Sequence, residues 1–377
     1  MLLALLAFGC LDKTSEEDET TYDGLAVLGY SGNDTENVYF STIGDADSAS
    51  LNAPRDLAFN PENPGELWVV NRTDDSTSIF FDAGTEDQTV EHIIDPFAMH
   101  FMEEVSSIAF GKPGHFGTCQ ESRNTYNGSS MPNNFMGPTL WPSDLEIYGK
   151  SNEEAVRYLS ELFGFHADLG SHLDMLHESP LCMGIAWEKD NVYWVFDGWN
   201  GDIVRYDFGE DHGPGYDDHS DGIIARYAIG EVEYVNNVPS HMELDRDTGL
   251  LYIADTGNNA IKVLDITIGT EGRSLATAEE GTSHYEMDNT DIQVLIDGAE
   301  HGMEYPSGLA LVDNTLFITD YGTGIIHAFD LDGEPIDQYD TQAGQYSISG
   351  IIAPSIDDLW LVGVNHNKVW RIQPSGQ

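Results

Sequence analysis

Residues 250–266, LLYIADTGNNAIKVLDI, have the pattern of one β-hairpin. The uniformly apolar run at 251–254 is typical of a strand that is buried on both faces. The sequence DTGNN at 255–259 predicts a tight turn, because Asp, Gly and Asn tolerate positive φ or hydrogen-bond to their own backbone. Apolar and polar residues then alternate from 260 to 266, as in a second strand. This hairpin recurs along the chain, and its copies decide the fold.

Six units are predicted, and each begins with a short apolar first strand, at 54–59, 105–110, 182–187, 239–244, 306–311 and 348–352; five of them contain the hairpin. Second strands follow at 67–71, 192–197, 251–255, 316–320 and 359–363, and third strands at 77–82, 202–207, 260–266, 324–330 and 368–372. Fourth strands are predicted at 88–94, 223–229, 290–296 and 335–340. Six units of about four strands predict an all-β fold, the six-bladed β-propeller, with a seven-bladed ring or a β-helix as alternatives.

The last unit ends after its third strand. An apolar stretch at 36–43 near the N-terminus can supply the missing fourth strand. We therefore expect an N-terminal strand to close the ring, which would leave no free sheet edge at the seam.

The second unit is irregular, with an insertion at about 120–180. Residues 120–138 are rich in Gly, Asn, Pro and Ser, whereas 139–141 and 145–148 could continue the sheet. The sequence SNEE at 151–154 resembles a capping box and predicts a helix that extends to about Phe163. Loops of this length in a compact domain tend to carry function.

The N-terminus has the pattern of an exported lipoprotein. Residues 1–9, MLLALLAFG, are interpreted as a signal-peptide remnant and Cys10 as the lipidation site, although no Lys or Arg precedes the apolar run. Residues 10–35 are predicted to be an acidic tether and 36–377 the propeller. We expect a membrane-anchored lipoprotein, periplasmic or on the cell surface. The alternatives are a secreted soluble form and an apolar N-terminal run that has no targeting role.

Two cysteines remain if Cys10 carries lipid, namely Cys119 and Cys182. An exported protein with one remaining pair usually oxidises it, so we predict a Cys119–Cys182 disulfide.

The charge balance restricts the partners. The chain has 66 acidic and 15 basic residues, a formal net charge of −51. Nucleic acid is therefore excluded as an expected partner, because its binding needs clustered Lys and Arg. An anionic membrane would repel the chain, so we expect membrane contact only through the lipid anchor. The carboxylates either solvate the surface or bind cations.

The repeats resemble NHL repeats, most closely at 251–261, LYIADTGNNAI, and over most of 50–373. The resemblance implies a propeller but does not specify an activity. NHL-type propellers include protein-binding modules, extracytoplasmic sensor domains and the lyase that completes peptide amidation. That lyase holds zinc with histidines at the starts of first strands in different blades.

Four histidines precede or begin first strands here, in loops that would face the propeller channel: His100, His177, His241 and His301. Converging imidazoles would suit zinc or another transition metal. Only His241 has the register that the lyase resemblance requires, since the other units have Asp56, Ser107, Gly184, Gly308 and Gly350 there. We predict a metal site on these histidines, with rim or core histidines satisfied by hydrogen bonds as the alternative.

Further candidates surround the predicted channel. Arg55, Arg72, Glu103 and His366 are predicted to bind a ligand, and a structural ion pair is the alternative for the two arginines. An acidic loop at 207–221 contains Asp211, Asp217, Asp218 and Asp221, which could bind calcium or another divalent ion. Its spacing does not fit an EF-hand.

Taken together, these patterns predict a monomeric binding module that takes a peptide, a protein or a small molecule on its channel face. The alternative is a metal-dependent lyase or hydrolase with a histidine-bound metal in the channel. Zinc or calcium are the expected cofactors, if any.

Overall fold

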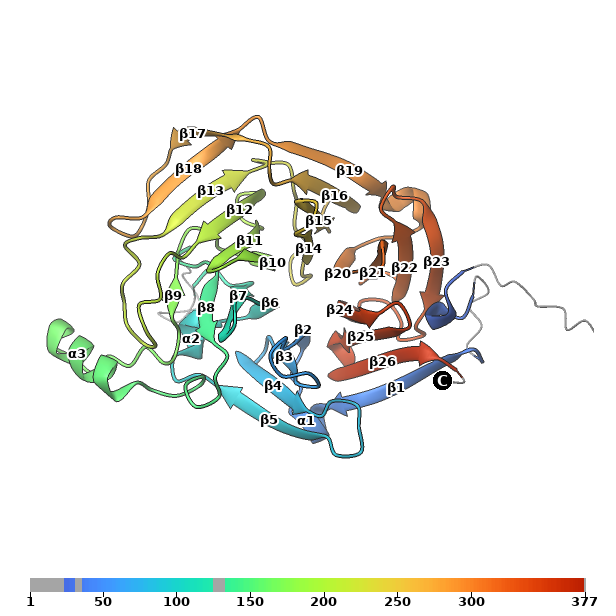
Figure 1. Ribbon diagram of the computed structural model, residues 1–377, viewed down its shortest axis with the longest axis horizontal. Coiled ribbons are helices and arrows are strands. Elements are labelled where there is room, and N and C mark those ends of the chain that lie inside the picture. Colours follow the sequence, from blue (N-terminus) through green and yellow to red (C-terminus); the bar gives the residue numbers. More distant parts are fainter. Residues whose placement is uncertain (1–23, 31–35, 125–132, 376–377) are drawn as a thin grey trace, which may run out of the picture.

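The computed structural model describes residues 24–30, 36–124 and 133–375 (Figure 1). The signal-peptide remnant at 1–9, Cys10 and most of the predicted tether lie outside these residues. Six sheets stand around a central axis, so the chain is a six-bladed β-propeller, as the repeats predict (Figure 1). The seven-bladed and β-helix alternatives are thereby excluded.

The first three blades contain the following strands. Blade 1 consists of β2 (Pro54–Phe59), β3 (Leu67–Asn71), β4 (Ser76–Phe81) and β5 (Thr89–Ile94). Blade 2 consists of β6 (Val105–Phe110), β7 (His115–Gln120), β8 (Thr139–Pro142) and β9 (Asp174–Met175). Blade 3 is built on β10 (Cys182–Lys189), β11 (Val192–Asp197), β12 (Asp202–Asp207) and β13 (Ile223–Tyr227).

The other three blades follow the same plan. Blade 4 consists of β14 (Met242–Asp245), β15 (Leu250–Asp255), β16 (Ala260–Asp265) and β19 (Asp291–Asp297). Blade 5 consists of β20 (Pro306–Val312), β21 (Thr315–Asp320), β22 (Ile325–Asp330) and β23 (Pro335–Asp340). Blade 6 consists of β24 (Ile348–Ser355), β25 (Asp358–Gly363), β26 (Lys368–Pro374) and β1 (Val38–Asp45). The hairpin that predicts the fold is β15–β16, with Asp255 paired to Ala260 across the turn.

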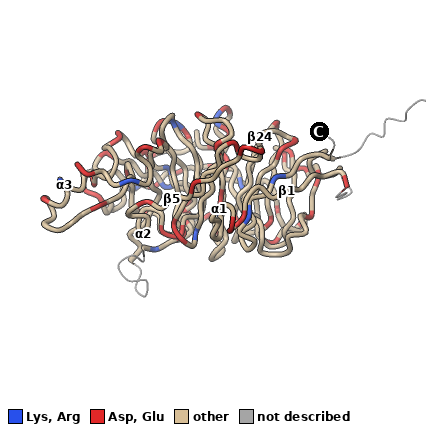
Figure 2. Tube along the Cα trace, turned by 90° about the horizontal axis from the view of Figure 1, so that it is seen from below, with Lys and Arg blue, Asp and Glu red and all other residues tan. Residues whose placement is uncertain are grey.

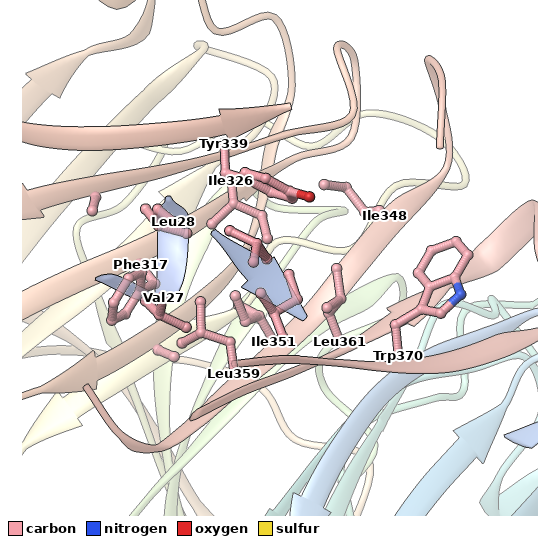
Figure 3. Close-up of a cluster of buried hydrophobic side chains, with 14 residues drawn as sticks. Val27, Leu28, Phe317, Ile326, Tyr339, Ile348, Ile351, Leu359, Leu361 and Trp370 are labelled. Carbon is pink, nitrogen blue, oxygen red and sulfur yellow. The ribbon is translucent and has the colours of Figure 1, made fainter. Parts of the chain in front are cut away.

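The ring is closed by the N-terminal strand, as predicted. β1 pairs antiparallel with β26, from Val38 opposite Pro374 to Asp45 opposite Lys368. Just upstream, the 3₁₀ turn η1 (Ala26–Leu28) buries Val27 and Leu28 completely against blades 5 and 6 (Figure 3). Residues 24–30 therefore pack on the body of the propeller.

Glycines at the starts of three first strands allow the blades to meet around the channel. A Cβ on Gly184 would lie 2.0 Å from the Ser240 carbonyl oxygen, and one on Gly308 would lie 2.3 Å from that of Ser349. A Cβ on Gly350 would lie 2.6 Å from the Asp56 Cα and 2.9 Å from the Arg55 carbonyl oxygen. No side chain fits at such distances, so the channel register of these units requires glycine.

Blade 3 has two strands that the sequence pattern does not predict. β17 (Thr270–Ser274) and β18 (Ser283–Asp288) form a hairpin between the third and fourth strands of blade 4. β18 pairs in parallel with β13, so the hairpin extends blade 3 to six strands (Figure 1).

The insertion in blade 2 contains the predicted helix, α3 (Glu153–Phe163), which projects from the edge of the ring (Figure 1). Its N-cap is Asn152 rather than Ser151, because the Asn152 side chain accepts from the backbone N–H groups of Glu154 and Ala155. The expected strand at 145–148 is wrong: this segment is a turn closed by hydrogen bonds from Ile147 and Tyr148 to the Asp144 carbonyl.

A disulfide joins blades 2 and 3, as predicted. Cys119 on β7 and Cys182 on β10 have Cα atoms 5.1 Å apart, and both side chains are fully buried. The bridge encloses the insertion and thereby fixes both of its ends.

Acidic residues are spread along the chain on both faces of the ring, whereas Lys and Arg are sparse (Figure 2). Within the described residues, no helix has both the length and the apolar character needed to cross a membrane.

We predict that Leu28→Ala lowers the free energy of unfolding by about 2–4 kcal/mol, because a fully buried leucine is truncated at the seam of the ring. Leu162→Ala on α3 is the control, since this leucine is 62% exposed and its truncation should change stability by less than about 1 kcal/mol. Urea unfolding followed by tryptophan fluorescence measures both. Equal effects of the two variants would show that η1 does not stabilise the ring.

Candidate ligand-binding site

The four histidines predicted to bind metal lie in three separate places. His241 is in the channel, where its Nε2 donates to the Ser106 carbonyl at 3.1 Å and its Nδ1 is 3.6 Å from Asp56 Oδ1. His301 ends η2 (Gly298–His301) and packs edge-on against Phe329. Only His100 and His177 are brought together, with their Nε2 atoms 3.2 Å apart.

The channel lumen beside His241 is small, about 240 Å³. Asp56 and Glu243 also line it. Burial, with the charge of Asp56 adding to it, raises the pKa of Glu243 to about 8. Ligand pockets usually have volumes of roughly 300–1,000 Å³, so the lumen suits few atoms beyond water or an ion.

The predicted arginines meet at the mouth of the channel. Arg55 and Arg72 share Glu121, at 3.5 Å from Arg55 Nη2 and 2.7 Å from Arg72 Nε. Arg72 also pairs with Glu104 at 3.2 Å. The arrangement fits the ion-pair alternative for these two residues. It leaves Nε and Nη1 of the buried Arg55 without a hydrogen-bond partner among the described residues.

The remaining two predicted ligand-binding residues also have protein partners. Glu103 is buried and its Oε2 accepts from the Ser122 hydroxyl at 2.5 Å. His366, in the turn η3 (Val364–His366), donates from Nε2 to the Ala343 carbonyl at 3.0 Å.

A cluster of titratable side chains lies beside blade 2, where His100 and His177 meet. His100 is carried by α2 (Ala98–Phe101), and His177 follows β9. The acidic loop of blade 3 contributes His219 and Asp217, and the connection between β17 and β18 contributes Glu279. Four separate connections between strands therefore supply the groups of one site.

Hydrogen bonds fix the protonation of these groups. His177 donates from Nδ1 to Glu279 at 2.5 Å. His219 donates from Nδ1 to Asp174 at 2.5 Å and from Nε2 to Asp217 at 3.1 Å. An imidazole that donates from both nitrogens is the imidazolium ion, so His219 is charged between two carboxylates.

The pKa shifts agree with this assignment. Burial lowers the pKa of His100 to about 3, and burial also lowers the pKa of His177. For His219, burial alone would lower the pKa, but the two carboxylates outweigh it and raise the pKa to about 10. For Glu279, burial alone would raise the pKa of the carboxyl group, but its interactions with His177 and His219 together outweigh burial and lower the pKa. The site thus combines neutral imidazoles, one imidazolium and ionised carboxylates.

Phenylalanines form the other walls of the site and enclose a cavity of about 720 Å³. Phe135 stacks on His177 with ring centroids 3.7 Å apart. Phe163, the last residue of α3, and Phe165, just beyond the C-cap Gly164, are 42% and 66% exposed and form the outer rim. The cavity has the size of a ligand pocket, an apolar wall and a few convergent polar groups. We call it the insertion pocket.

The predicted cation loop does not gather its four acids at one point. Asp211 lies 3.2 Å from His115 Nε2, Asp217 lines the insertion pocket, and Asp218 accepts from Ser220. Asp221 instead lies beside His212, which donates to it at 2.9 Å.

Sequence reasoning placed His219 in the acidic loop but did not assign it to this site, and it missed Glu279. A signal was present for His219, because five of the chain's 13 histidines fall between 166 and 219. Glu279 had none, since its position depends on the β17–β18 hairpin crossing to blade 3.

The carboxyl group of Asp75, which lies beside the arginine pair, makes the stability of the protein depend on pH. Burial, reinforced by Glu103 and Glu104, raises the pKa of Asp75 to about 7, although the Glu104 N–H donates to it at 2.7 Å. The unfolded value is about 3.9, so the folded state binds the proton more tightly. Stability from this group is therefore lost as the pH rises from about 4 to 7.

We predict that Asp75→Asn removes that loss. Between pH 5 and pH 8, the free energy of unfolding of the variant should rise by about 1–2 kcal/mol relative to that of wild type. This is less than the full pKa shift implies, because the carboxyl group of Asp75 is partly exposed. Asp87→Asn, on an exposed loop, should leave the profile unchanged. Urea unfolding at both pH values measures the difference, and parallel wild-type and Asp75→Asn profiles would contradict it.

Comparisons with known proteins give the fold. No protein-family model matches the sequence, and no curated protein matches it. Among solved structures, an auxiliary nutrient binding protein from Bacteroides thetaiotaomicron is similar, with TM-score 0.54, 11% identity, and coverage of 89% of this chain and 76% of that one. A second, from Bacteroides ovatus, has TM-score 0.52, 12% identity, and coverage of 90% and 77%.

The calcium-binding protein regucalcin from Agrobacterium tumefaciens is also similar, with TM-score 0.50, 13% identity, and coverage of 89% and 94%. Identities this low carry the architecture and no activity. The chain is a six-bladed β-propeller, and the NHL-like pattern of its repeats is consistent with that fold.

Proposed function

We propose that this chain is a binding protein that takes a small ligand into the insertion pocket. One observation carries the proposal: a cavity of about 720 Å³ joins phenylalanine walls to a convergent set of histidines and carboxylates, of which His100 and His177 are buried. The similar nutrient binding propellers support a binding role. The metal-dependent lyase or hydrolase is not favoured, because the histidines expected to hold its metal are dispersed.

The chemistry of the pocket indicates the class of ligand. Asp217 and Glu279 are ionised, and only His219 among their partners is charged. The protein as a whole carries a net charge of −51, which attracts cations. Phenylalanine faces also bind cations. A molecule with an apolar body and a hydrogen-bond-donating or cationic head, such as a short apolar peptide or an amine, fits best.

A matched pair of variants tests the pocket. Ala278→Trp places an indole at the pocket rim, whereas Ala276→Trp places one two residues away on an exposed side chain that does not line the pocket. We expect compounds from a panel of apolar amines, amino acids and short peptides to raise the Tm of wild type and Ala276→Trp. The same compounds should leave Ala278→Trp unchanged.

Differential scanning fluorimetry, followed by calorimetric titration of each hit, measures these shifts. Binding that survives Ala278→Trp would place the ligand elsewhere. A panel without a single saturable ligand would count against the binding role.

Export and lipid anchoring belong to the same proposal. The Cys119–Cys182 disulfide supports an oxidising compartment. We expect the protein to partition with membranes through lipid on Cys10, and to be a monomer. Cys10→Ala should move it to the soluble fraction, as seen by fractionation and immunoblotting, whereas Cys10→Ala protein that stays with the membranes would contradict the anchor.

We expect any cofactor of this protein to be a divalent cation. The similarity to regucalcin, a calcium-binding protein, supports a cation of this kind. The choice between zinc and calcium stays a prediction.

A further inference from the structure

We propose that Asp174, His212 and Asp221 form a binding site for a divalent transition-metal ion at the joint between blades 2 and 3. Asp174 comes from β9, and the other two residues come from the acidic loop of blade 3. One donor atom from each residue lies within 4.8 Å of the others. Two carboxylates and one imidazole thus surround a single point.

Asp174 supplies the observation that points to a ligand. Its side chain is fully buried. Oδ1 accepts from His219 at 2.5 Å and from the Met175 N–H at 2.7 Å, whereas Oδ2 has no partner within the described part of the chain. A buried carboxylate oxygen without a partner is destabilising, because it has lost its hydration, and a bound cation would remove that cost.

The loop is folded so that its two ligands meet. Asp221 accepts from the Glu210 N–H at 2.8 Å and from His212 Nε2 at 2.9 Å, which closes the loop on itself. Asp221 can approach the backbone at 209 only because this residue is glycine: a Cβ there would lie 2.4 Å from Asp221 Oδ2. A cation would replace the His212–Asp221 hydrogen bond with two metal–ligand bonds.

The three side chains form a path from solvent to the interior. Asp221 is 36% exposed at its side chain, His212 is 18% exposed and Asp174 is 1% exposed. An ion can therefore enter from the loop side and finish against the buried carboxylate. Water would complete its coordination on the exposed side.

The donor set selects the class of ion. Imidazole suits zinc and similar transition-metal ions, carboxylates suit manganese, and calcium takes six to eight oxygen ligands. Two carboxylates and one imidazole therefore favour Mn²⁺ or Zn²⁺ over Ca²⁺. The two carboxylates balance the charge of a divalent ion, so the three-residue site is neutral when it is filled.

The ion would also act on the insertion pocket. His219 bridges the two, since it donates to Asp174 on one side and to Asp217 on the other. A cation on Asp174 and Asp221 would hold the acidic loop, and with it one wall of the pocket. This second role rests on the proposed function, whereas metal binding itself does not.

Titration calorimetry on the full chain, stripped with EDTA and exchanged into chelator-free buffer, tests the site with MnCl₂, ZnCl₂ and CaCl₂. We expect one Mn²⁺ or Zn²⁺ per chain, a rise in Tm on binding, and weaker binding of Ca²⁺. Asp221→Asn and His212→Gln should each weaken binding at least tenfold. Both residues lie on the loop, so these variants should fold. Asp332→Asn, on an exposed turn of blade 5, is the matched control and should bind as wild type.

Three results would overturn the proposal: no saturable binding, binding that both loop variants retain, or a preference for Ca²⁺. Ala278→Trp separates this site from the pocket, because it should bind metal normally while losing the ligand. Metal binding without any ligand would reject only the proposed function, and ligand binding without any metal would reject only the metal site.

Discussion

The antiparallel ladder between β1 and β26 is the interaction on which the rest of the ring depends. Each blade packs between two neighbours, so an open ring would expose a sheet edge and two apolar faces. The contacts at the seam join residues that are far apart in the chain: the Leu25 N–H donates to Asp337 and the Ala53 N–H to Asn367, across 312 and 314 residues. Such closure carries a large entropic cost, which the buried η1 residues help to offset. The channel and its mouth have a defined shape only once this seam has formed.

Most of the architecture could be predicted because its signals are local and repeated. Apolar first and second strands, a turn rich in Asp, Gly and Asn, and an alternating third strand recur in each unit. Ring closure followed from the incomplete last unit, and the disulfide followed from the two cysteines that remain after Cys10. The glycines in register with His241 were visible too, but their reason, backbone contact between neighbouring first strands, needs coordinates.

The insertion pocket could not be predicted, because its titratable groups come from four connections whose course no periodicity specifies. The segment 283–288, SHYEMD, is mostly polar, and nothing in it indicates pairing with β13. Only that pairing brings Glu279 next to His177, so the sequence does not indicate their contact. The charge of His219 likewise depends on Asp174 of another blade. Histidine density pointed to the region, whereas the protonation states and the cavity arise only from tertiary contacts.

The β17–β18 hairpin also bears on how such a ring can evolve. Propellers gain or lose blades when a whole unit is duplicated or deleted, which requires that each unit carries its own sheet. Here the fourth unit encodes the outer two strands of the third sheet. Deleting unit 4 would strip blade 3 of its outer edge, and duplicating it would create a hairpin without a sheet to join. Duplication or deletion of unit 4 alone would therefore break the third sheet, so this joint constrains changes in the number of blades.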